Sequence, residues 1–390
     1  MDFDYVVVPA LILLIGMLVI WLSIRRLFSL SAKVSGRWRR IAESIVLPVV
    51  VLVVGGITAS AIFNAIAIHW FRAHNPPPGE IYIVNGHKMH MYCMGSGTPT
   101  IVLEAGLGDD AIVWGGVQPV LSKTTRICAY DRAGLGWSDP APPPRDADHI
   151  AADLHGLLRE AKITGPVVLM GHSMGGIYLR DYASHYPENV AGIVFVDGDT
   201  PFQNKRIAAA VKAGGGIQQP PPWIGELLQR AELDTGIPRL LGECSRTMPR
   251  FDAYAGRLVA EDGCSVRVSA IAAEENGRDQ SFQETVHTGP YGALPILIFS
   301  HDPAAALSRK FPPAWVASHA LRVDLENIWS QEQEDLKKLS TRSRRIVAKG
   351  SNHSIQGHRP DLIEKEVPLF IEQIRGTAPQ PATYGATTTE

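Results

Sequence analysis

Two long apolar stretches dominate the hydrophobic pattern at the start of the chain. Residues 5–24 and residues 44–68 contain no charged side chain. About 20 apolar residues in an α-helix are enough to cross the hydrocarbon core of a bilayer. Asp2 and Asp4 precede the first stretch in place of the basic residues of a secretory signal, and no small-residue cleavage site follows it. The pattern therefore predicts a membrane anchor over residues 1–72 with two transmembrane helices.

Beyond the proline-rich linker at residues 73–79, the pattern changes to short β-like runs separated by turns. Asn85-Gly86 is a hairpin signal between the first two runs. Segments with helical periodicity alternate with the later runs. This alternation predicts an α/β fold, in which a mostly parallel sheet is covered by helices on both faces. We expect eight strands, at residues 81–84, 87–93, 100–103, 126–130, 166–170, 192–196, 295–299 and 345–348.

The alternation is interrupted once. Residues 198–294 combine helix-like pieces with runs of glycine and proline, and we interpret them as a helical cap inserted over the sheet. The α/β domain then consists of residues 80–197 and residues 295–375. Residues 376–390 are rich in Thr, Ala, Pro and Gly, which predicts a disordered tail.

The distribution of charge indicates how the chain is placed in a membrane. The formal net charge of −2 gives no basic excess, so nucleic acid is not an expected partner. Between the two apolar stretches, the sequence contains several Lys and Arg residues and a single acid, Glu43. Short loops rich in Lys and Arg stay in the cytoplasm. The chain is therefore predicted to cross an inner or plasma membrane twice and to place its globular domain on the periplasmic or extracellular side.

A serine lies between small residues in the segment GHSMGG, residues 171–176, directly after the fifth predicted strand. Ser173 thus occupies a tight turn from a strand to a helix, which only small neighbours allow. This turn and the segments LEAGLGDD, YDRAGLGWSDP and GSNH follow one another in an order that resembles the α/β-hydrolase family over residues 80–375. The resemblance implies an eight-stranded α/β-hydrolase sheet with Ser173 as the nucleophile.

A serine hydroxyl needs a base to take its proton and an acid to orient that base. The family order of serine, acid and histidine implies His353 as the base, with His358 as the fallback. Two positions compete for the role of the acid. Asp197 ends the sixth predicted strand and is preferred, but Asp302, after the seventh strand, stays open as the alternative.

Acyl transfer also needs donors for the oxyanion, usually two backbone N–H groups. The resemblance implies that Met174, directly after the nucleophile, supplies one of them. The second is expected from Leu107, in the loop after the third strand, although this loop departs from the His-Gly form of many relatives. Asp131 and Arg132 are expected to fix loops beneath the site.

The sequence contains no pattern that calls for a cofactor. His87, His90, His301 and His358 form no recognisable ligand cluster, and Cys-x-x-Cys and nucleotide-binding motifs are absent, so we expect no metal and no cofactor. Together with the two apolar stretches, the resemblance thus implies a membrane-anchored serine hydrolase that cleaves carboxylic, including lipid-like, esters through an acyl-enzyme.

Other functions stay open on the same residues. A C–C bond hydrolase, a thioesterase or a peptidase would use the same serine, and a non-catalytic membrane protein would use the fold as a ligand sensor.

The predicted cap contains an apolar stripe at helical spacing, formed by Trp223, Ile224, Leu227 and Leu228. Such a stripe predicts either simple packing or a lid near the bilayer that admits apolar substrates.

The four cysteines are predicted to form disulfides if the domain lies outside the cytoplasm. The strand order that the resemblance implies makes the strands of Cys93 and Cys128 neighbours, which favours a bridge between them. Cys244 and Cys264 would then close a loop within the cap.

Overall fold

The chain forms two compact units, each assembled from separate parts of the sequence. The first combines Met1–Pro76 with Pro220–Ser269, and the second combines Pro77–Gln219 with Ala270–Glu390. The predicted cap is thereby divided, since its middle belongs with the apolar helices and its two ends belong with the sheet. The computed structural model describes residues 6–33, 37–214, 222–245, 261, 264–265, 267–308, 318–379 and 384–390.

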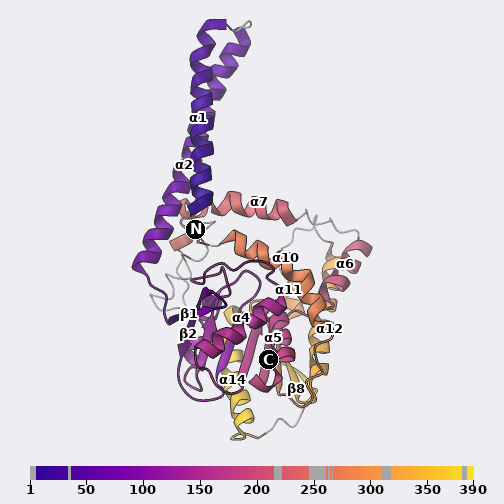
Figure 1. Ribbon diagram of the computed structural model, residues 1–390. Helices are drawn as coiled ribbons and strands as arrows, with labels where there is room; N and C mark the ends of the chain where they lie inside the picture. Colours follow the sequence, from indigo (N-terminus) through magenta and orange to yellow (C-terminus); the bar gives the residue numbers. More distant parts are fainter. Residues whose placement is uncertain are drawn as a thin grey trace. The chain divides into compact units, whose positions relative to one another are not determined.

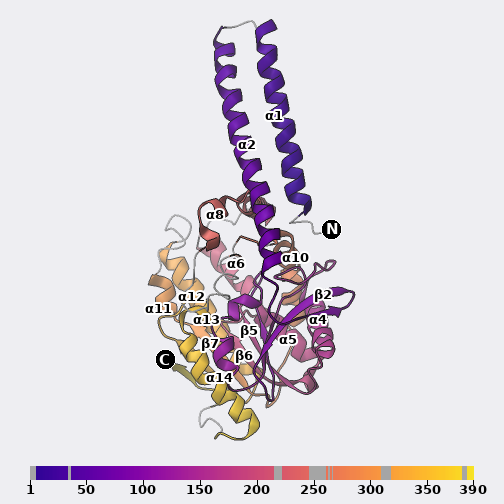
Figure 2. The ribbon, with the colours of Figure 1, turned by 90° about the vertical axis from the view of Figure 1, so that its left-hand side faces the viewer.

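Two long helices run side by side in the first unit (Figures 1 and 2). They are α1, Val8–Lys33, and α2, Arg37–His74. Both are long and apolar enough to cross a membrane, over Val8–Phe28 and Glu43–His74. The second helix therefore continues beyond the predicted end at residue 68. Gly16 lets the helices approach closely, because a Cβ at this position would clash with the Thr58 side chain.

The rest of the first unit attaches to the C-terminal part of α2. It contains α7 (Pro222–Leu233), α8 (Ile237–Leu240) and the short helix η4 (Glu243–Ser245). Arg239 Nε donates to Asn64 Oδ1 over 2.7 Å, and Asn64 Nδ2 donates to the Leu233 carbonyl over 3.2 Å. Gly236 adopts a φ of 71°, and a side chain there would collide with Asn64. The cap segment is thus bonded directly to an apolar helix.

The second unit contains one mixed, mostly parallel sheet with the strand order β1-β2-β4-β3-β5-β6-β7-β8-β9. The β1–β2 and β2–β4 pairs are antiparallel and the others are parallel. All eight predicted strands are present, which confirms the predicted α/β class. Their bounds are β1 Glu80–Val84, β2 His87–Met94, β3 Ile101–Glu104, β4 Ile127–Tyr130, β5 Val167–His172, β6 Val190–Val196, β7 Ile296–His301 and β8 Ser343–Ala348.

A ninth strand, β9 (Thr387–Thr389), pairs in parallel with β8. It lies in the segment 376–390, so the prediction of a disordered tail is wrong for these residues. Composition alone favoured disorder there, but the otherwise unpaired edge of β8 offers hydrogen bonds to a run of β-branched threonines.

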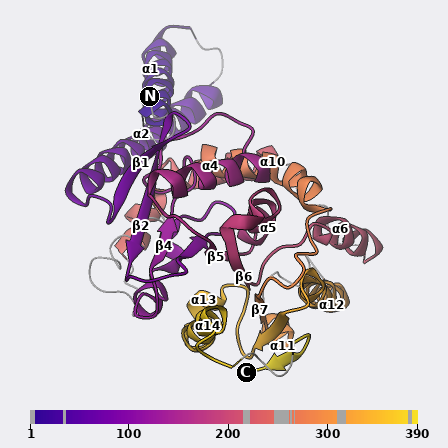
Figure 3. The same cartoon turned by 60° about the horizontal axis from the view of Figure 1, so that its bottom comes forward.

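Helices cover both faces of the sheet (Figure 3). Apolar residues of α4 and α5 pack in one buried cluster with the sheet, and those of α14 pack in another. Burial of each such large aliphatic side chain contributes about 1.5–3 kcal/mol. The helices of this unit are α3 Gln118–Leu121, α4 Ala147–Glu160, α5 Gly175–His185, α6 Gln203–Ala213, α10 Val268–Thr285, α11 Pro303–Ser308, α12 His319–Asp335, α13 Ile355–His358 and α14 Pro360–Arg375, with 3₁₀ turns η2 Ala111–Trp114, η3 Pro187–Asn189 and η5 Leu336–Leu339.

Both predicted disulfides are present. Cys93 and Cys128 lie opposite each other on the paired strands β2 and β4, and their sulfurs are bonded. Cys244 is bonded to Cys264 in the first unit. The pairing predicted from the sequence is therefore confirmed for all four cysteines.

Candidate active site

Ser173 lies at the sharp turn between β5 and α5. Its φ of 53° is in the left-handed region, which is uncommon for a residue other than glycine. A Cβ at Gly175 would come within 2.7 Å of the Ala105 carbonyl oxygen, so only glycine fits at this position, two residues after the serine. The Ser173 N–H donates to the Val196 carbonyl over 3.3 Å, and the Asp199 N–H donates to the Ser173 carbonyl over 2.8 Å. The turn is thus held against the end of β6.

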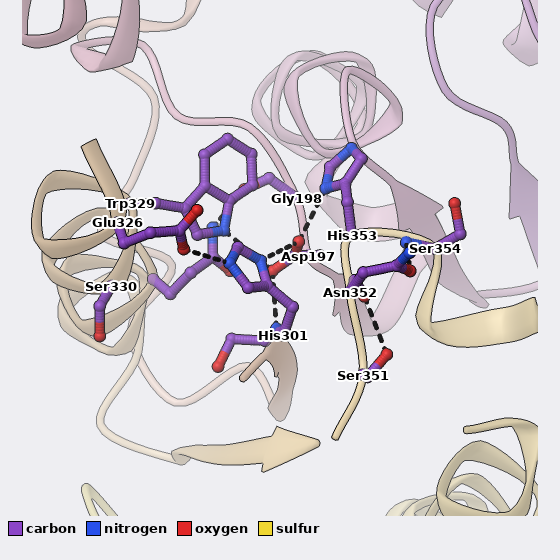
Figure 4. A network of polar contacts seen from close by, with 12 residues as sticks. Asp197, Gly198, His301, Glu326, Trp329, Ser330, Ser351, Asn352, His353 and Ser354 are labelled. Atoms are coloured by element: carbon purple, nitrogen blue, oxygen red, sulfur yellow. Dashed lines mark hydrogen bonds and ion pairs between the residues drawn. The ribbon is translucent and has the colours of Figure 1, made fainter. Parts of the chain in front are cut away.

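His353 follows β8 and turns toward the same edge of the sheet. Its Nδ1 lies 2.7 Å from Asp197 Oδ2 (Figure 4). A carboxylate only accepts hydrogen bonds, so Nδ1 carries the proton and Nε2 keeps a lone pair. Among the described residues, none bonds to Nε2, and 43% of the side chain is exposed. The ring centroid lies 4.7 Å from that of His172, the residue before Ser173. His353 therefore presents a free acceptor nitrogen next to the serine turn.

Asp197 is completely buried at the end of β6, with a φ of 50°. Its Oδ1 accepts from the His301 N–H at 3.0 Å and from Trp329 Nε1 at 2.9 Å, while Oδ2 faces His353 and His301. Burial alone raises the pKa of Asp197, but the hydrogen bonds from His301 and His353 outweigh it and hold that pKa well below its usual range. The carboxylate is therefore ionised at neutral pH.

The charge of Asp197 changes the basicity of the ring that it holds. Burial lowers the pKa of His353, yet the hydrogen bond and the charge of Asp197 outweigh this effect, so the pKa ends above its ordinary value. A raised pKa makes this ring a stronger proton acceptor than a free histidine.

Asp302 and His358, the competing candidates for acid and base, point elsewhere. Asp302 Oδ1 accepts from the Ala304 N–H and Oδ2 from the Gly350 N–H, both over 3.0 Å. The carboxylate thus ties the start of α11 to the loop after β8. His358 is exposed, and its Nδ1 lies 3.0 Å from the Ser354 carbonyl. The geometry brings Asp197, and not Asp302, to His353.

The two backbone groups predicted as oxyanion donors belong to the residue after the serine and to the loop after β3. A Cβ placed on Gly106 would come within 3.3 Å of the Ser173 Cβ, so the loop that carries Leu107 touches the serine. Met174 is the first residue after the serine and is buried. Within the described part of the chain, neither the Leu107 nor the Met174 N–H donates to another group. Both N–H groups are therefore without an acceptor among the described residues, as oxyanion donors must be before a substrate binds.

Arg132 fixes the loop of Leu107 from below, in line with its expected structural role. It is buried and donates to the carbonyls of Ala105 and Gly106 over 2.9 and 2.6 Å. Its charge is paired with Glu104 and Glu274, each over 2.7 Å. Because a buried charge is tolerated only when it is paired, this network anchors the loop firmly.

His301, Glu326 and Trp329 also belong to the site, and sequence reasoning missed them. In the sequence, His301 is considered only together with His87, His90 and His358, whereas in the structure its Nδ1 lies 2.7 Å from Asp197 Oδ2 and its Nε2 lies 2.7 Å from Glu326 Oε2 (Figure 4). The position of His301 at the end of a buried strand, at the same sheet edge as Asp197, is the signal that could have indicated this.

Asp197, His301 and His353 are also close enough to hold a metal ion, with ligand atoms within 4.8 Å of one another. In this structure, Nδ1 of His301 and Nδ1 of His353 each lie 2.7 Å from Asp197 Oδ2.

Comparison with known proteins points to one fold family. Residues 99–232 match the family described as alpha/beta hydrolase fold. A Gibberella zeae protein named AB hydrolase superfamily protein is 26% identical over 306 residues, which cover 71% of this chain and 87% of that protein. An uncharacterized protein of Schizosaccharomyces pombe is 32% identical over 186 residues, or 37% of this chain and 35% of that protein, so the chain matches about a third of its length.

The same likeness holds among solved structures. A thermophilic esterase from Thermogutta terrifontis superposes with a TM-score of 0.52 at 18% sequence identity, over 76% of this chain and 99% of the esterase. At this level of identity the similarity concerns the fold.

Proposed function

We propose that this chain, which belongs to the α/β-hydrolase family, is a membrane-anchored serine hydrolase that cleaves carboxylic esters through an acyl-enzyme. One observation carries the proposal: beside a strained serine turn, a histidine is held by a buried carboxylate and keeps its Nε2 free. This is the arrangement that a nucleophilic serine needs.

In the proposed reaction, Ser173 Oγ attacks the ester carbonyl carbon while His353 Nε2 takes the hydroxyl proton. The tetrahedral oxyanion is stabilised by the N–H groups of Leu107 and Met174. When the C–O bond to the alcohol breaks, His353 returns the proton to the leaving oxygen, and the acyl group stays on the serine. A water molecule then attacks the acyl-enzyme, again with His353 as the base, and the carboxylic acid and free serine result.

We assign the orienting acid to Asp197 and a structural role to Asp302. Asp197 accepts the Nδ1–H of His353 and stabilises the imidazolium that forms during each proton transfer. Asp302 holds the loop after β8, in which His353 lies.

We further propose that α1 and α2 cross an inner or plasma membrane and that the catalytic unit lies on the periplasmic or extracellular side. The basic residues between the two helices support a cytoplasmic position for that loop. The two disulfides are compatible with an oxidising compartment.

Lipid-like esters are the substrates that the first unit favours. The segment bonded to α2 exposes four large leucines, Leu227, Leu228, Leu240 and Leu241. An exposed apolar surface attached to a membrane-length helix suits contact with lipid chains. Ile224 is half-buried, and the side chain of Trp223, also assigned to the predicted stripe, lies outside the described residues.

Labelling with a fluorophosphonate tests the proposed function, because only an activated serine reacts with it. We expect the full-length chain in detergent to be labelled, and the variants Ser173→Ala and His353→Ala to remain unlabelled. Ser96→Ala, which changes an exposed serine away from the site, is the matched control. If the unchanged protein resists labelling while it is folded, the non-catalytic sensor replaces this proposal.

A series of p-nitrophenyl esters of increasing acyl length tests the substrate class. In the double variant Leu227→Ser/Leu228→Ser we expect kcat/KM to fall roughly threefold to tenfold for long acyl chains and to stay unchanged for short ones. Leu369→Ser, at an exposed leucine of α14, is the control. An equal loss at all lengths would argue against lipid-like esters, and cleavage of thioesters or peptides in their place would change the reaction class.

A further inference from the structure

A second histidine lies on the far side of the candidate acid from His353. His301 ends β7, and its ring is placed between Asp197 and Glu326 (Figure 4). Each of its ring nitrogens lies 2.7 Å from a carboxylate oxygen. Because carboxylates accept and do not donate, both nitrogens must carry a proton. The ring is therefore an imidazolium, with a positive charge next to the carboxylate that holds His353.

The helix α12 packs against His301 and Asp197 with two of its side chains. It supplies Glu326, and one turn later it supplies Trp329, whose Nε1 donates to Asp197 Oδ1 over 2.9 Å. The Trp329 ring also meets the His353 ring edge to face, with 5.3 Å between their centroids. Only 7% of the His301 side chain is exposed, so the ring has no freedom to leave Asp197.

We infer that His301 is a positioning residue for the proposed hydrolysis: it ties Asp197 to Glu326, fixes the carboxylate in the orientation that His353 uses, and offsets part of its negative charge. His301 has no contact with the serine turn among the described residues, so it acts through Asp197. This inference rests on the proposed function of Ser173 and His353.

The charge of His301 has a direct consequence for the base. Burial lowers the pKa of His301, but the hydrogen bonds and charges of Asp197 and Glu326 raise it to about 10, so the ring stays cationic over the working pH range. Its positive charge opposes protonation of His353 and lowers the pKa of that ring. Without the cation, Asp197 would favour the charged form of His353 more strongly, and a higher pH would be needed to obtain the neutral base.

Other charged groups around the two rings stay in place when His301 changes. Asp199, after β6, and Asp109, in the loop after β3, interact electrostatically with His353. Burial lowers the pKa of His172 to about 3, so this neighbour is neutral. Arg345 on β8 interacts electrostatically with Asp197. The Asp302 carboxylate accepts a hydrogen bond from the Gly350 N–H.

Two substitutions separate the charge of His301 from its hydrogen bond. In His301→Asn the amide nitrogen takes the place of Nδ1 and still donates to Asp197, but the charge is lost. In His301→Gln the amide nitrogen lies near the position of Nε2, so both the charge and the bond to Asp197 are lost. His358→Asn removes an exposed histidine near the site and serves as the matched control.

The rate of fluorophosphonate labelling of Ser173 is measured against pH for the full-length protein and these variants. We expect the acidic limb of the profile to move up by about one pH unit in both His301 variants, the size of one nearby charge. The plateau rate should stay close to the unchanged protein in His301→Asn and fall roughly tenfold in His301→Gln, as for one lost hydrogen bond to a charged group. His358→Asn should leave limb and plateau unchanged.

Several outcomes would overturn this inference. If both His301 variants keep the original acidic limb and the original plateau rate, His301 only fills space; should His301→Gln fail to fold, the limb of His301→Asn alone decides. Loss of labelling on treatment with EDTA, restored by zinc, would assign the cluster to a metal. If the unchanged protein is not labelled at all, the proposed function fails first, so the two failures are distinguishable.

Discussion

The pair of His353 and Asp197 and the pair of His90 and Asp131 share one geometry, with Nδ1 2.7 Å from a carboxylate oxygen in each. They differ at the other ring nitrogen. His90 Nε2 is bonded to the Pro78 carbonyl, and only 3% of this side chain is exposed. His353 Nε2 has no partner among the described residues, and 43% of its side chain is exposed. An aspartate–histidine pair can thus serve as a base only where its far nitrogen is left open.

The surroundings of the two rings lead to opposite uses of the same bond. His90 faces an acceptor at both nitrogens, so both carry protons and no lone pair is left for catalysis. Burial lowers the pKa of His90, but the charge of Asp131 outweighs it and the pKa ends above its usual value. Asp131 also accepts from the N–H groups of Ala111 and Trp137. This pair joins β2 to the loops after β4 and stabilises the fold.

The largest expected effect comes from removing the base of the pair whose far nitrogen is open, His353 and Asp197. We predict that His353→Ala lowers kcat on a short p-nitrophenyl ester by roughly 10⁴-fold or more, as Ser173→Ala should, because members of a triad act as a unit. The midpoint of thermal unfolding should hardly change, since the ring is partly exposed. Near-normal turnover in either variant would exclude the proposed mechanism.

The choice of acid comes next. Asp197→Asn should lower kcat by roughly 10³- to 10⁴-fold, because the ring of His353 would lose the acceptor that sets its tautomer. Asp302→Asn should lower kcat less than about threefold, since within the described residues this carboxylate binds backbone N–H groups and no side chain of the site. Both variants are assayed side by side at several pH values, and a larger loss in Asp302→Asn would reverse the assignment.

Breaking the pair of His90 and Asp131, in which both ring nitrogens are bonded, should lower the stability of the fold and leave the activity intact. His90→Ala leaves the Asp131 carboxylate buried without its cation, which should lower the free energy of unfolding by about 3–5 kcal/mol. The kcat of the folded fraction should stay within about threefold. Thermal and urea unfolding measure the first quantity, with Lys88→Ala, at an exposed residue of the same strand, as the control. A loss of kcat comparable to that of His353→Ala would end the distinction between the pairs.

The disulfide between β2 and β4 sharpens the same comparison, because it links the strand of His90 to the strand that precedes Asp131. Its half-cystines are 35 residues apart. The double variant Cys93→Ser/Cys128→Ser should therefore lower the free energy of unfolding by about 4 kcal/mol, through the greater freedom of the unfolded chain. Turnover at temperatures below unfolding should be unchanged. A fall in kcat with unaltered stability would mean that these strands control the site.

The sequence by itself predicted those features that depend on neighbouring residues. The spacing of apolar side chains indicated two membrane-length helices and eight strands, because burial follows the period of each element. The small residues around Ser173 indicated the strained turn, since only they fit a strand that turns sharply into a helix. The strand order that the family resemblance implies also made the strands of Cys93 and Cys128 neighbours, and the structure places the two cysteines opposite each other.

Only the tertiary structure decided which groups meet at the sheet edge. Asp197 and Asp302 both end buried strands, and it is the direction of each carboxylate, set by Trp329 and by Gly350, that brings only Asp197 to His353. His301 lies between Asp197 and Glu326 of α12, a residue that is 25 positions further along the chain. Contacts of this kind join segments that are distant in sequence, so no local pattern of polar and apolar residues records them.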